Sequence, residues 1–409
     1  TMKRYQWMGI MLSLVLLLCS CGTDKEVEKK AGESTSTPSA TASVTPLISE
    51  DEAFSEAEKI VKTMTIEQKV GQMFLVDLLQ LDASPSVDGT AYKATDSMKQ
   101  AIIDYHLGGV YLTKENIKSQ KQTKKLVQNL QASVVSGSAL YVAVEEDGGG
   151  ENSISAKVED LKDTGYVTPK EMGQNMTANQ IYESGKTIAG ELTKIGINLN
   201  LAPVADLASD QNPSYAMRCL GSDADGVADL LDDFVSGMRE GGLSVTLKTF
   251  PGIGNVSADV TESIAENTDS LMTIRDTNFV PYASGIQAGA DCVMVSNAAY
   301  SKLTVKKVPA FMSQDIVTKL LREELGFDGI VMTSPLNDNV IENNYTNEFA
   351  VVEAVKAGCD LIVLPGNFKE CYEALITAVE EGRIDEKVIN TSVRRILQNK
   401  IQRGILVLE

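Results

Sequence analysis

The sequence predicts an α/β fold, a single (β/α)8 barrel of TIM type in which parallel strands alternate with helices. Three observations lead to this class. Short apolar runs recur between helical stretches, their spacing of roughly 25–55 residues suits βα units with insertions, and the pattern fills about 350 residues. An open doubly wound sheet is the alternative. No glycine-rich phosphate-binding motif follows a first strand, which argues against a nucleotide-binding version of that sheet.

Eight apolar segments are the candidate strands of this barrel. They share a short length and a position between helical stretches, and they are Gln72–Asp77, Gly109–Leu112, Leu140–Val144, Ile197–Pro203, Leu243–Leu247, Cys292–Ser296, Gly329–Thr333 and Asp360–Pro365. The segment from Asp51 to Met64 has the pattern of an amphipathic helix and is expected to open the barrel domain. We therefore assign residues 51–409 to the barrel.

The N-terminal segment has the pattern of an export signal. Lys3 and Arg4 precede an apolar core from Met8 to Leu18, which is too short for a comfortable membrane span. The following Leu18-Cys19-Ser20-Cys21 resembles a bacterial lipoprotein box, and this resemblance implies lipidation of Cys21. A plain signal peptide with chance cysteines is the alternative. We expect a signal peptide over residues 1–20, an exported protein, and a lipid anchor on the extracellular or periplasmic face of the membrane.

Residues 21–50 combine the lipidated cysteine with a flexible linker. From Gly22 onward this segment is rich in Ser, Thr, Pro, Glu and Lys and nearly free of large apolar residues, so it has no core to bury. The chain as a whole has a formal charge of -19 and a pI near 4.6. Such a surface repels nucleic acid and anionic membranes, which excludes nucleic acid as an expected partner.

Cysteine and histidine usage argues against a metal centre. Beyond the lipoprotein box, four cysteines remain without metal-ligand spacing: Cys219, Cys292, Cys359 and Cys371. The apolar surroundings of Cys292 and Cys359 predict buried thiols. The sequence does not decide whether any of the four cysteines form a disulfide. The only histidine in the chain is His106, so a histidine-based zinc site is excluded. We expect no metal and no cofactor.

Eight short motifs, in this order and spacing, resemble glycoside hydrolase family 3, in its single-domain β-N-acetylhexosaminidase-like branch. The resemblance extends from about Met64 to Leu406, and its landmarks are Met64–Gln72, Leu107–Val110, Ala143–Gly149, Asn200–Asp206, Arg218–Gly221, Lys248–Gly252, Leu321–Gly329 and Ala357–Leu361. It implies a (β/α)8 barrel with its site at the C-terminal ends of the strands. No second domain of the kind found in many members is expected after the barrel.

The resemblance also implies where the nucleophile of a retaining glycosidase belongs, because such an enzyme needs a carboxylate on one side of the glycosidic bond. The family places an aspartate after the strand that here is Gly329–Thr333. This chain has Ser334 there, followed by Pro335. A serine hydroxyl without a base is a poor nucleophile at neutral pH. The nearest carboxylate, Asp338, is expected to need an unusual loop path to reach the same place.

The acid/base position is substituted as well. By resemblance, an Asp/His pair on a loop supplies the proton, and the matching residues here are Asp259 and Thr261. Two further histidines of the family correspond to Thr249 and Asn297. His106 precedes a strand and is therefore expected at the opposite end of the barrel, in a structural role. We assign no residue as catalytic.

Five residues are candidates for substrate binding by the same resemblance: Glu145, Asp147, Asp206, Arg218 and Lys248. The arginine that usually follows the paired glycines is Gly150 here. Fold support, through a buried ion pair and a strand-end cap, is the equally weighted alternative for these positions. Glu145 and Asp147 lie two residues apart at one strand end, so their side chains are expected to face the same way. They could form an acid pair or bind a cation. The favoured interpretation is that they belong to a solvated loop.

The sequence thus predicts a cell-surface lipoprotein with a family 3-like barrel whose catalytic positions are impaired. Its expected role is binding carbohydrate, including peptidoglycan fragments, or acting as a scaffold. The alternative is an active O-glycosyl hydrolase of the β-N-acetylhexosaminidase type in carbohydrate or cell-wall metabolism. The sequence leaves enzyme activity open, because the fold argues for a glycosidase whereas Ser334 and Thr261 argue against turnover.

Overall fold

Eight short, largely buried strands form one parallel sheet in the computed structural model, which describes residues 48–134, 138–149 and 167–408. The expected signal peptide, Cys21, residues 22–47 of the linker and Gly150 lie outside the described residues, whereas Glu50, assigned to the linker, begins a helix. The strands are β1 (Phe74–Asp77), β2 (Gly109–Tyr111), β3 (Tyr141–Val144), β4 (Leu199–Asn200), β5 (Ser244–Phe250), β7 (Cys292–Val295), β9 (Ile330–Thr333) and β10 (Ile362–Val363). Each one falls on a segment predicted from the sequence.

The sheet curls until its two edges meet. Its strand order is β10-β1-β2-β3-β4-β5-β7-β9, with every neighbouring pair parallel. A parallel bridge between Met332 and Leu361 joins the last strand to the chain just before β10. Around this bridge the Leu361 amide donates to the Val331 carbonyl at 3.1 Å. The predicted (β/α)8 barrel is therefore confirmed, and the open doubly wound sheet is wrong.

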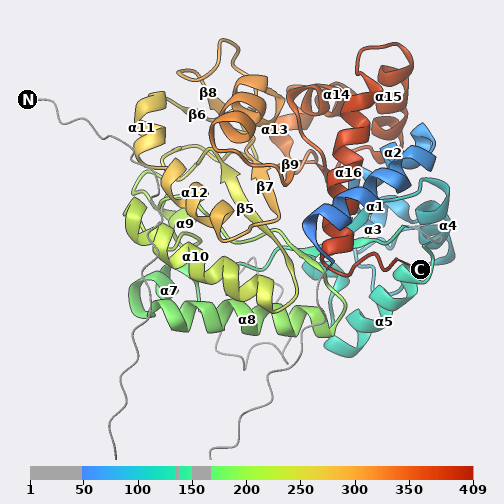
Figure 1. Cartoon of the computed structure of the whole chain (residues 1–409), viewed down its shortest axis with the longest axis horizontal. Coiled ribbons are helices and arrows are strands. Elements are labelled where there is room, and N and C mark those ends of the chain that lie inside the picture. The colour runs from blue at the N-terminus through green and yellow to red at the C-terminus, as the bar shows by residue number, and fades with distance from the viewer. Residues whose placement is uncertain (1–47, 135–137, 150–166, 409) are drawn as a thin grey trace, which may run out of the picture. The chain divides into compact units, whose positions relative to one another are not determined.

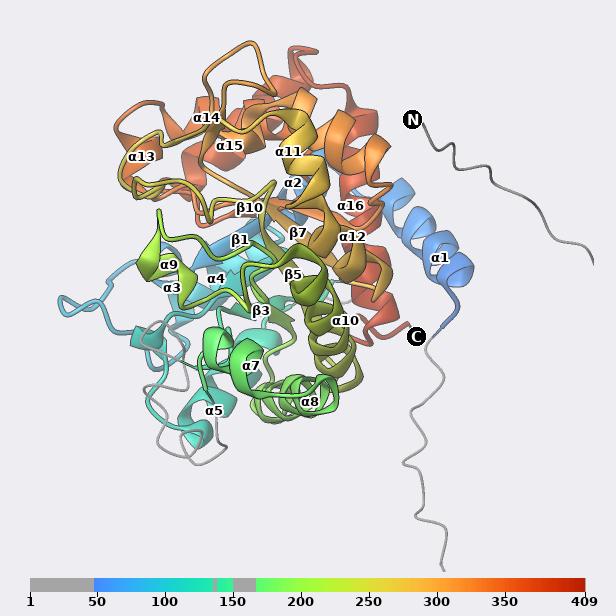
Figure 2. The ribbon, with the colours of Figure 1, turned by 90° about the vertical axis from the view of Figure 1, so that its left-hand side faces the viewer.

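Helices surround the strands on the outside of the barrel (Figures 1 and 2). They are α1 (Glu50–Thr63), α2 (Ile66–Gln72), α3 (Leu78–Leu81), α4 (Asp96–Asp104), η1 (Lys114–Asn116), α5 (Gln120–Gln131), α7 (Pro169–Asn175), α8 (Ala178–Lys194), α9 (Pro213–Ala216), α10 (Ala224–Glu240), α11 (Leu271–Asp276), α12 (Phe279–Gln287), η3 (Ala310–Met312), η4 (Asp315–Glu324), α13 (Asn339–Glu342), α14 (Asn347–Ala357), α15 (Phe368–Glu380) and α16 (Glu386–Gln402). No helix among them is long and apolar enough to cross a membrane.

Local sequence signals set where these helices begin and end. Thr177 starts α8 with a capping box, because its hydroxyl accepts from the Gln180 amide while the Gln180 side chain accepts from the Thr177 amide at 2.8 Å. Gly358 ends α14 with φ near 111°, a left-handed conformation that glycine adopts without a Cβ clash. The helix predicted from Asp51 to Met64 is α1, which packs against the C-terminal helix α16 (Figure 1).

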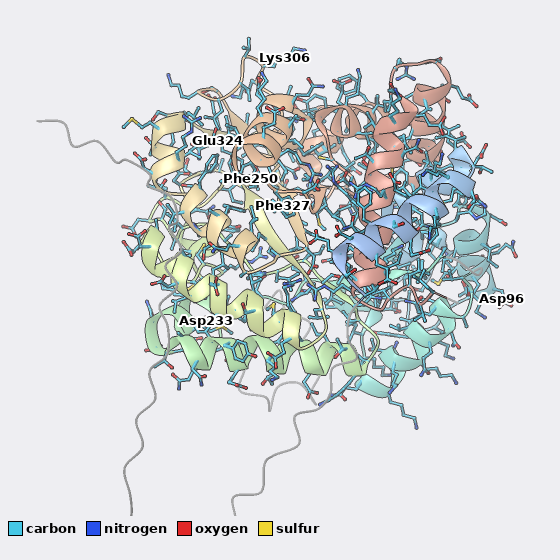
Figure 3. All side chains as sticks on the ribbon, in the orientation of Figure 1. Asp96, Asp233, Phe250, Lys306, Glu324 and Phe327 are labelled. Atoms are coloured by element: carbon cyan, nitrogen blue, oxygen red, sulfur yellow. The ribbon has the colours of Figure 1, made fainter. Side chains whose placement is uncertain are left out.

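The core lies inside the barrel and between the barrel and its helices. Phe250 at the end of β5 is fully buried and stacks on Phe279 of α12 with ring centroids 5.6 Å apart. Figure 3 shows side chains filling this space, with Phe250 in the interior and Asp96 and Lys306 at the periphery. Burying aromatic and branched side chains of this size supplies most of the free energy that holds a barrel together.

A second, two-stranded sheet was not predicted. It pairs β6 (Glu266–Asn267) with β8 (Ala299–Tyr300) in parallel. The two strands belong to the chain segments after β5 and after β7, on the side of the barrel where strands end. This small sheet therefore ties together two of the segments that surround the barrel mouth.

Candidate functional site

A cleft of about 560 Å³ opens at the C-terminal ends of the strands. Four residues expected to converge there, Glu145, Arg218, Lys248 and Ser334, all line it, which confirms the predicted convergence. Its size is that of a small-molecule site. A second cavity of about 510 Å³ lies around Asp291 and Arg403, next to the starts of the strands. In barrels of this type, chemistry takes place at the C-terminal end, so the first cleft is the candidate site.

Two cations and two carboxylates form an ionic cluster in this cleft. Arg218 donates from Nε to Asp147 Oδ2 at 2.6 Å and pairs with Glu145 through Nη2. Lys248 Nζ lies 2.6 Å from Glu145 Oε1 and 2.9 Å from Asp147 Oδ1, and it also donates to the Leu201 carbonyl. The predicted solvated loop is wrong for Asp147, which is 5% exposed, whereas the Glu145 side chain is 32% exposed.

The two cations of the ionic cluster keep Glu145 ionised. Burial raises the pKa of Glu145, but the nearby charges of Lys248 and then Arg218 outweigh burial and lower this pKa to about 2. Lys248 Nζ donates hydrogen bonds to Glu145 Oε1 and to the Leu201 carbonyl, while its 2.9 Å contact with Asp147 Oδ1 is an ion pair without a hydrogen bond. The Nη1 group of Arg218 makes no hydrogen bond to a described residue. The Arg218 side chain is 25% exposed and that of Lys248 only 3%, so Arg218 is the cation of the cluster that can offer a donor to a ligand in the cleft.

Asp206 lies behind the cleft rather than on its surface. It is fully buried and accepts hydrogen bonds at both carboxylate oxygens. The donors are the Thr249 amide and hydroxyl, the Ile253 amide, and the hydroxyls of Tyr215 and Tyr282, at 2.8–3.1 Å. Burial raises the pKa of Asp206 above its usual value. This pattern is that of fold support, the alternative that the sequence left open for Asp206.

Ser334 lies in the cleft at the place where the family resemblance puts the nucleophile. Its hydroxyl donates to the Val295 carbonyl at 2.9 Å, and its amide donates to the same carbonyl. This bond holds the serine against β7 and gives it no base. A serine in this setting has no route to an alkoxide at neutral pH.

The expected acid/base loop reaches the cleft through Asp259 and Thr261. The Thr261 hydroxyl donates to Asp259 Oδ1 at 2.7 Å, so the threonine caps the carboxylate instead of relaying its proton. The Thr261 carbonyl accepts from the Val340 amide at 2.7 Å. This bond joins the loop after β5 to helix α13, which follows β9.

Asp338, four residues after Ser334, also lines the cleft. It precedes α13, but its side chain does not cap that helix and accepts from Asn297 Nδ2 at 2.8 Å instead. Burial first, and then the charges of Asp259 and Glu145, raise the pKa of Asp338 to about 7. The cleft thus contains one carboxylate that stays ionised and another that titrates near neutral pH.

His106 lies at the opposite end of the barrel, as predicted. It lies between α4 and β2, and its carbonyl accepts from Gln72 Nε2 at 2.7 Å. All four described cysteines are free and buried, as predicted for Cys292 and Cys359. Among the described residues, no group of carboxylates, cysteines and histidine has the geometry to hold a metal ion.

Sequence reasoning missed two tyrosines that line the cleft. Tyr111 ends β2, and its position at a strand end was a usable signal. Tyr215 belongs to the short helix α9, where no pattern marked it. The Arg218 guanidinium lies over the Tyr215 ring at 5.6 Å, which orients the arginine toward the cleft.

Comparison with known proteins gives a consistent picture. The sequence profile described as "Glycosyl hydrolase family 3 N terminal domain" matches residues 65–399. Beta-hexosaminidase A of Pseudoalteromonas piscicida is 26% identical over 369 residues, which are 82% of this chain and 61% of that protein. A beta-hexosaminidase of Xylella fastidiosa is 29% identical over 266 residues, covering 64% of this chain and 77% of the relative. The chain thus spans less than two thirds of the first relative's length.

Solved structures agree with these relatives. A glycoside hydrolase family 3 beta-N-acetylglucosaminidase from Paenibacillus sp. superposes with a TM-score of 0.75 at 29% identity, over 85% of this chain and 64% of that one. A beta-N-acetylhexosaminidase from Beutenbergia cavernae superposes with a TM-score of 0.71 at 28% identity, over 82% of this chain and 98% of that one.

Proposed function

This chain belongs to the glycosyl hydrolase family 3 N-terminal domain family, and from that premise we propose that its cleft binds carbohydrate without turning it over. The ligands are amino-sugar glycans, including peptidoglycan fragments. The relatives are named as hexosaminidases, which supports an amino-sugar ligand. The observation that carries the proposal is the ionic cluster: it fixes Arg218 at the cleft with an unused Nη1.

The absence of turnover rests on two positions. Ser334 donates its proton to a carbonyl and lacks the negative charge that stabilises an oxocarbenium-like transition state. Thr261 has no titrating group to protonate a leaving oxygen. A domain that only binds sugar needs neither a nucleophile nor a proton donor. It needs a cleft with a fixed hydrogen-bond donor, and this cleft has one in Arg218.

An active hydrolase is the second candidate. The names of the relatives favour it, and so does Asp338, a carboxylate in the same cleft with a pKa raised to about 7. A group that titrates near neutral pH is suited to general acid or base work. The two candidates differ in one measurable respect, the fate of the bound sugar.

Binding should depend on Arg218. In calorimetry with a tetrasaccharide of N-acetylglucosamine, we expect saturable binding to the wild type and a loss of about tenfold or more in Arg218→Ala, equivalent to about 1.4 kcal/mol. Arg383→Ala is the matched control, because Arg383 pairs with Glu381 at an exposed site outside the cleft. Thermal melting should first establish that both variants are folded. Equal affinities of the wild type and Arg218→Ala would contradict the assigned role.

We further propose that the protein is an exported lipoprotein anchored through Cys21. The support is the Leu18–Cys21 segment that follows an apolar core. Replacing Cys21→Ala should block lipid attachment and move the protein from the detergent phase to the aqueous phase on detergent partitioning. If the variant partitions like the wild type, the assignment of a lipoprotein box is wrong.

A further inference from the structure

The side of the cleft formed after β7 and β9 has a buried acceptor without a donor. Asn297 is 1% exposed and lines the cleft. Its Nδ2 donates to Asp338 at 2.8 Å, but its Oδ1 makes no hydrogen bond within the part of the chain that the structure describes. A buried acceptor without a partner costs free energy, so this oxygen favours a ligand that brings a donor.

Carboxylates gather beside this acceptor. Asp259 and Glu262 face Asp338 from the loop after β5, and Glu145 faces it from the end of β3. The two cations of the cleft, Arg218 and Lys248, are both engaged by Glu145 and Asp147. In the described residues, Asp338, Asp259 and Glu262 form no ion pair with a cation of the protein. This side of the cleft therefore has an excess of negative charge.

A donor-rich cation is the ligand group that fits these features. An ammonium group has three donors, no acceptor and a positive charge. It would satisfy Asn297 Oδ1, pair with Asp338 and relieve the repulsion among the neighbouring carboxylates. An acetamido group has a single neutral N–H donor and would leave that repulsion in place.

We infer, building on the proposed binding function, that the saccharide bound by this cleft has a free amino group, as in a de-N-acetylated amino sugar. Its ammonium group binds between Asn297 Oδ1 and the Asp338 carboxylate, while Arg218 Nη1 donates to the sugar from the opposite side of the cleft. The unpaired acceptor and the adjacent unpaired carboxylates together define the ammonium subsite.

Binding of the ammonium should expel a proton. Burial and like charges raise the pKa of Asp338 to about 7, so below neutral pH the free protein has this carboxyl mainly protonated. A bound cation favours the ionised form, and the proton leaves to the buffer. The measured heat of binding then depends on the ionisation enthalpy of the buffer, which a purely structural role of Asp338 would not produce.

The test titrates the wild-type protein at about pH 6 with tetrasaccharides of glucosamine and of N-acetylglucosamine, each in two buffers of different ionisation enthalpy. We expect about tenfold tighter binding of the amine form, with buffer-dependent heat. Asp338→Asn should abolish this preference and the buffer dependence. Asp96→Asn, the same substitution at an exposed site outside the cleft, should retain both.

The outcomes separate the two proposals. Equal affinities, or tighter binding of the acetylated form, would overturn the ammonium subsite and leave the binding function standing. Binding of neither sugar would overturn the binding function itself. If Asp96→Asn loses the preference as Asp338→Asn does, overall charge rather than the subsite is responsible, and the inference is wrong. The comparison of the two sugars uses the wild-type protein alone. It therefore tests the ammonium subsite even if the Asp338→Asn variant folds poorly.

Discussion

The wild-type protein is expected to hydrolyse an aryl β-N-acetylglucosaminide more slowly than an active family member by about 10²–10⁴-fold or more, because proton transfer alone contributes that much. The Thr261 and Ser334 hydroxyls donate to Asp259 and to the Val295 carbonyl, and neither side chain is a carboxylate or an imidazole that could act as acid/base or nucleophile in the usual retaining mechanism. The measurement compares initial rates of the purified domain and an active family member at the same enzyme concentration. A wild-type rate within tenfold of the active enzyme would contradict this expectation.

Two variants refine this test. Ser334→Asp alone should stay near background, since no proton donor has been restored and Pro335 constrains the loop. Ser334→Asp combined with Thr261→His should raise the rate, because a histidine at 261 would have the carboxylate of Asp259 within reach. Thr249 and Asn297 stand where the family has further histidines, so the rescue is expected to be partial. Robust wild-type hydrolysis that disappears in Glu145→Gln or Asp147→Asn would instead assign catalysis to the ionic cluster.

Asp206→Ala should cost about 3–5 kcal/mol of unfolding free energy, since it leaves buried donors without an acceptor. Five donors from three separate segments converge on this carboxylate. Urea unfolding followed by circular dichroism measures the loss. Asp229→Ala, at an exposed position of α10, should stay within about 0.5 kcal/mol of the wild type. A small loss of stability combined with abolished sugar binding would assign Asp206 to the ligand instead.

The barrel was predictable because its signals are local. Buried parallel strands appear as short apolar runs such as Cys292–Ser296, and their order along the chain matches their order around the barrel. The convergence of Glu145 and Ser334 followed from the same logic, since the C-terminal ends of parallel strands meet at one mouth.

The details of the site were not predictable, because they depend on contacts between distant segments. The entry of Asp338 into the cleft accompanies a hydrogen bond between Val340 and Thr261, which are 79 residues apart in the sequence. The ionic cluster likewise joins residues that lie far apart in the chain. Tyr215 reaches the cleft from a four-residue helix that has no periodic signal. Such long-range pairings carry no pattern in a single sequence.

On the proposed function, the cleft binds an amino-sugar glycan and releases it intact. Equilibrium dialysis of the purified domain against a mixture of glucosamine and N-acetylglucosamine tetrasaccharides, followed by mass spectrometry of both chambers, tests it most directly. We predict that tetrasaccharide is enriched in the protein chamber and that no shorter sugar appears in either one. Accumulation of monosaccharide or shorter oligomers would contradict this function. So would equal concentrations of each tetrasaccharide in the two chambers.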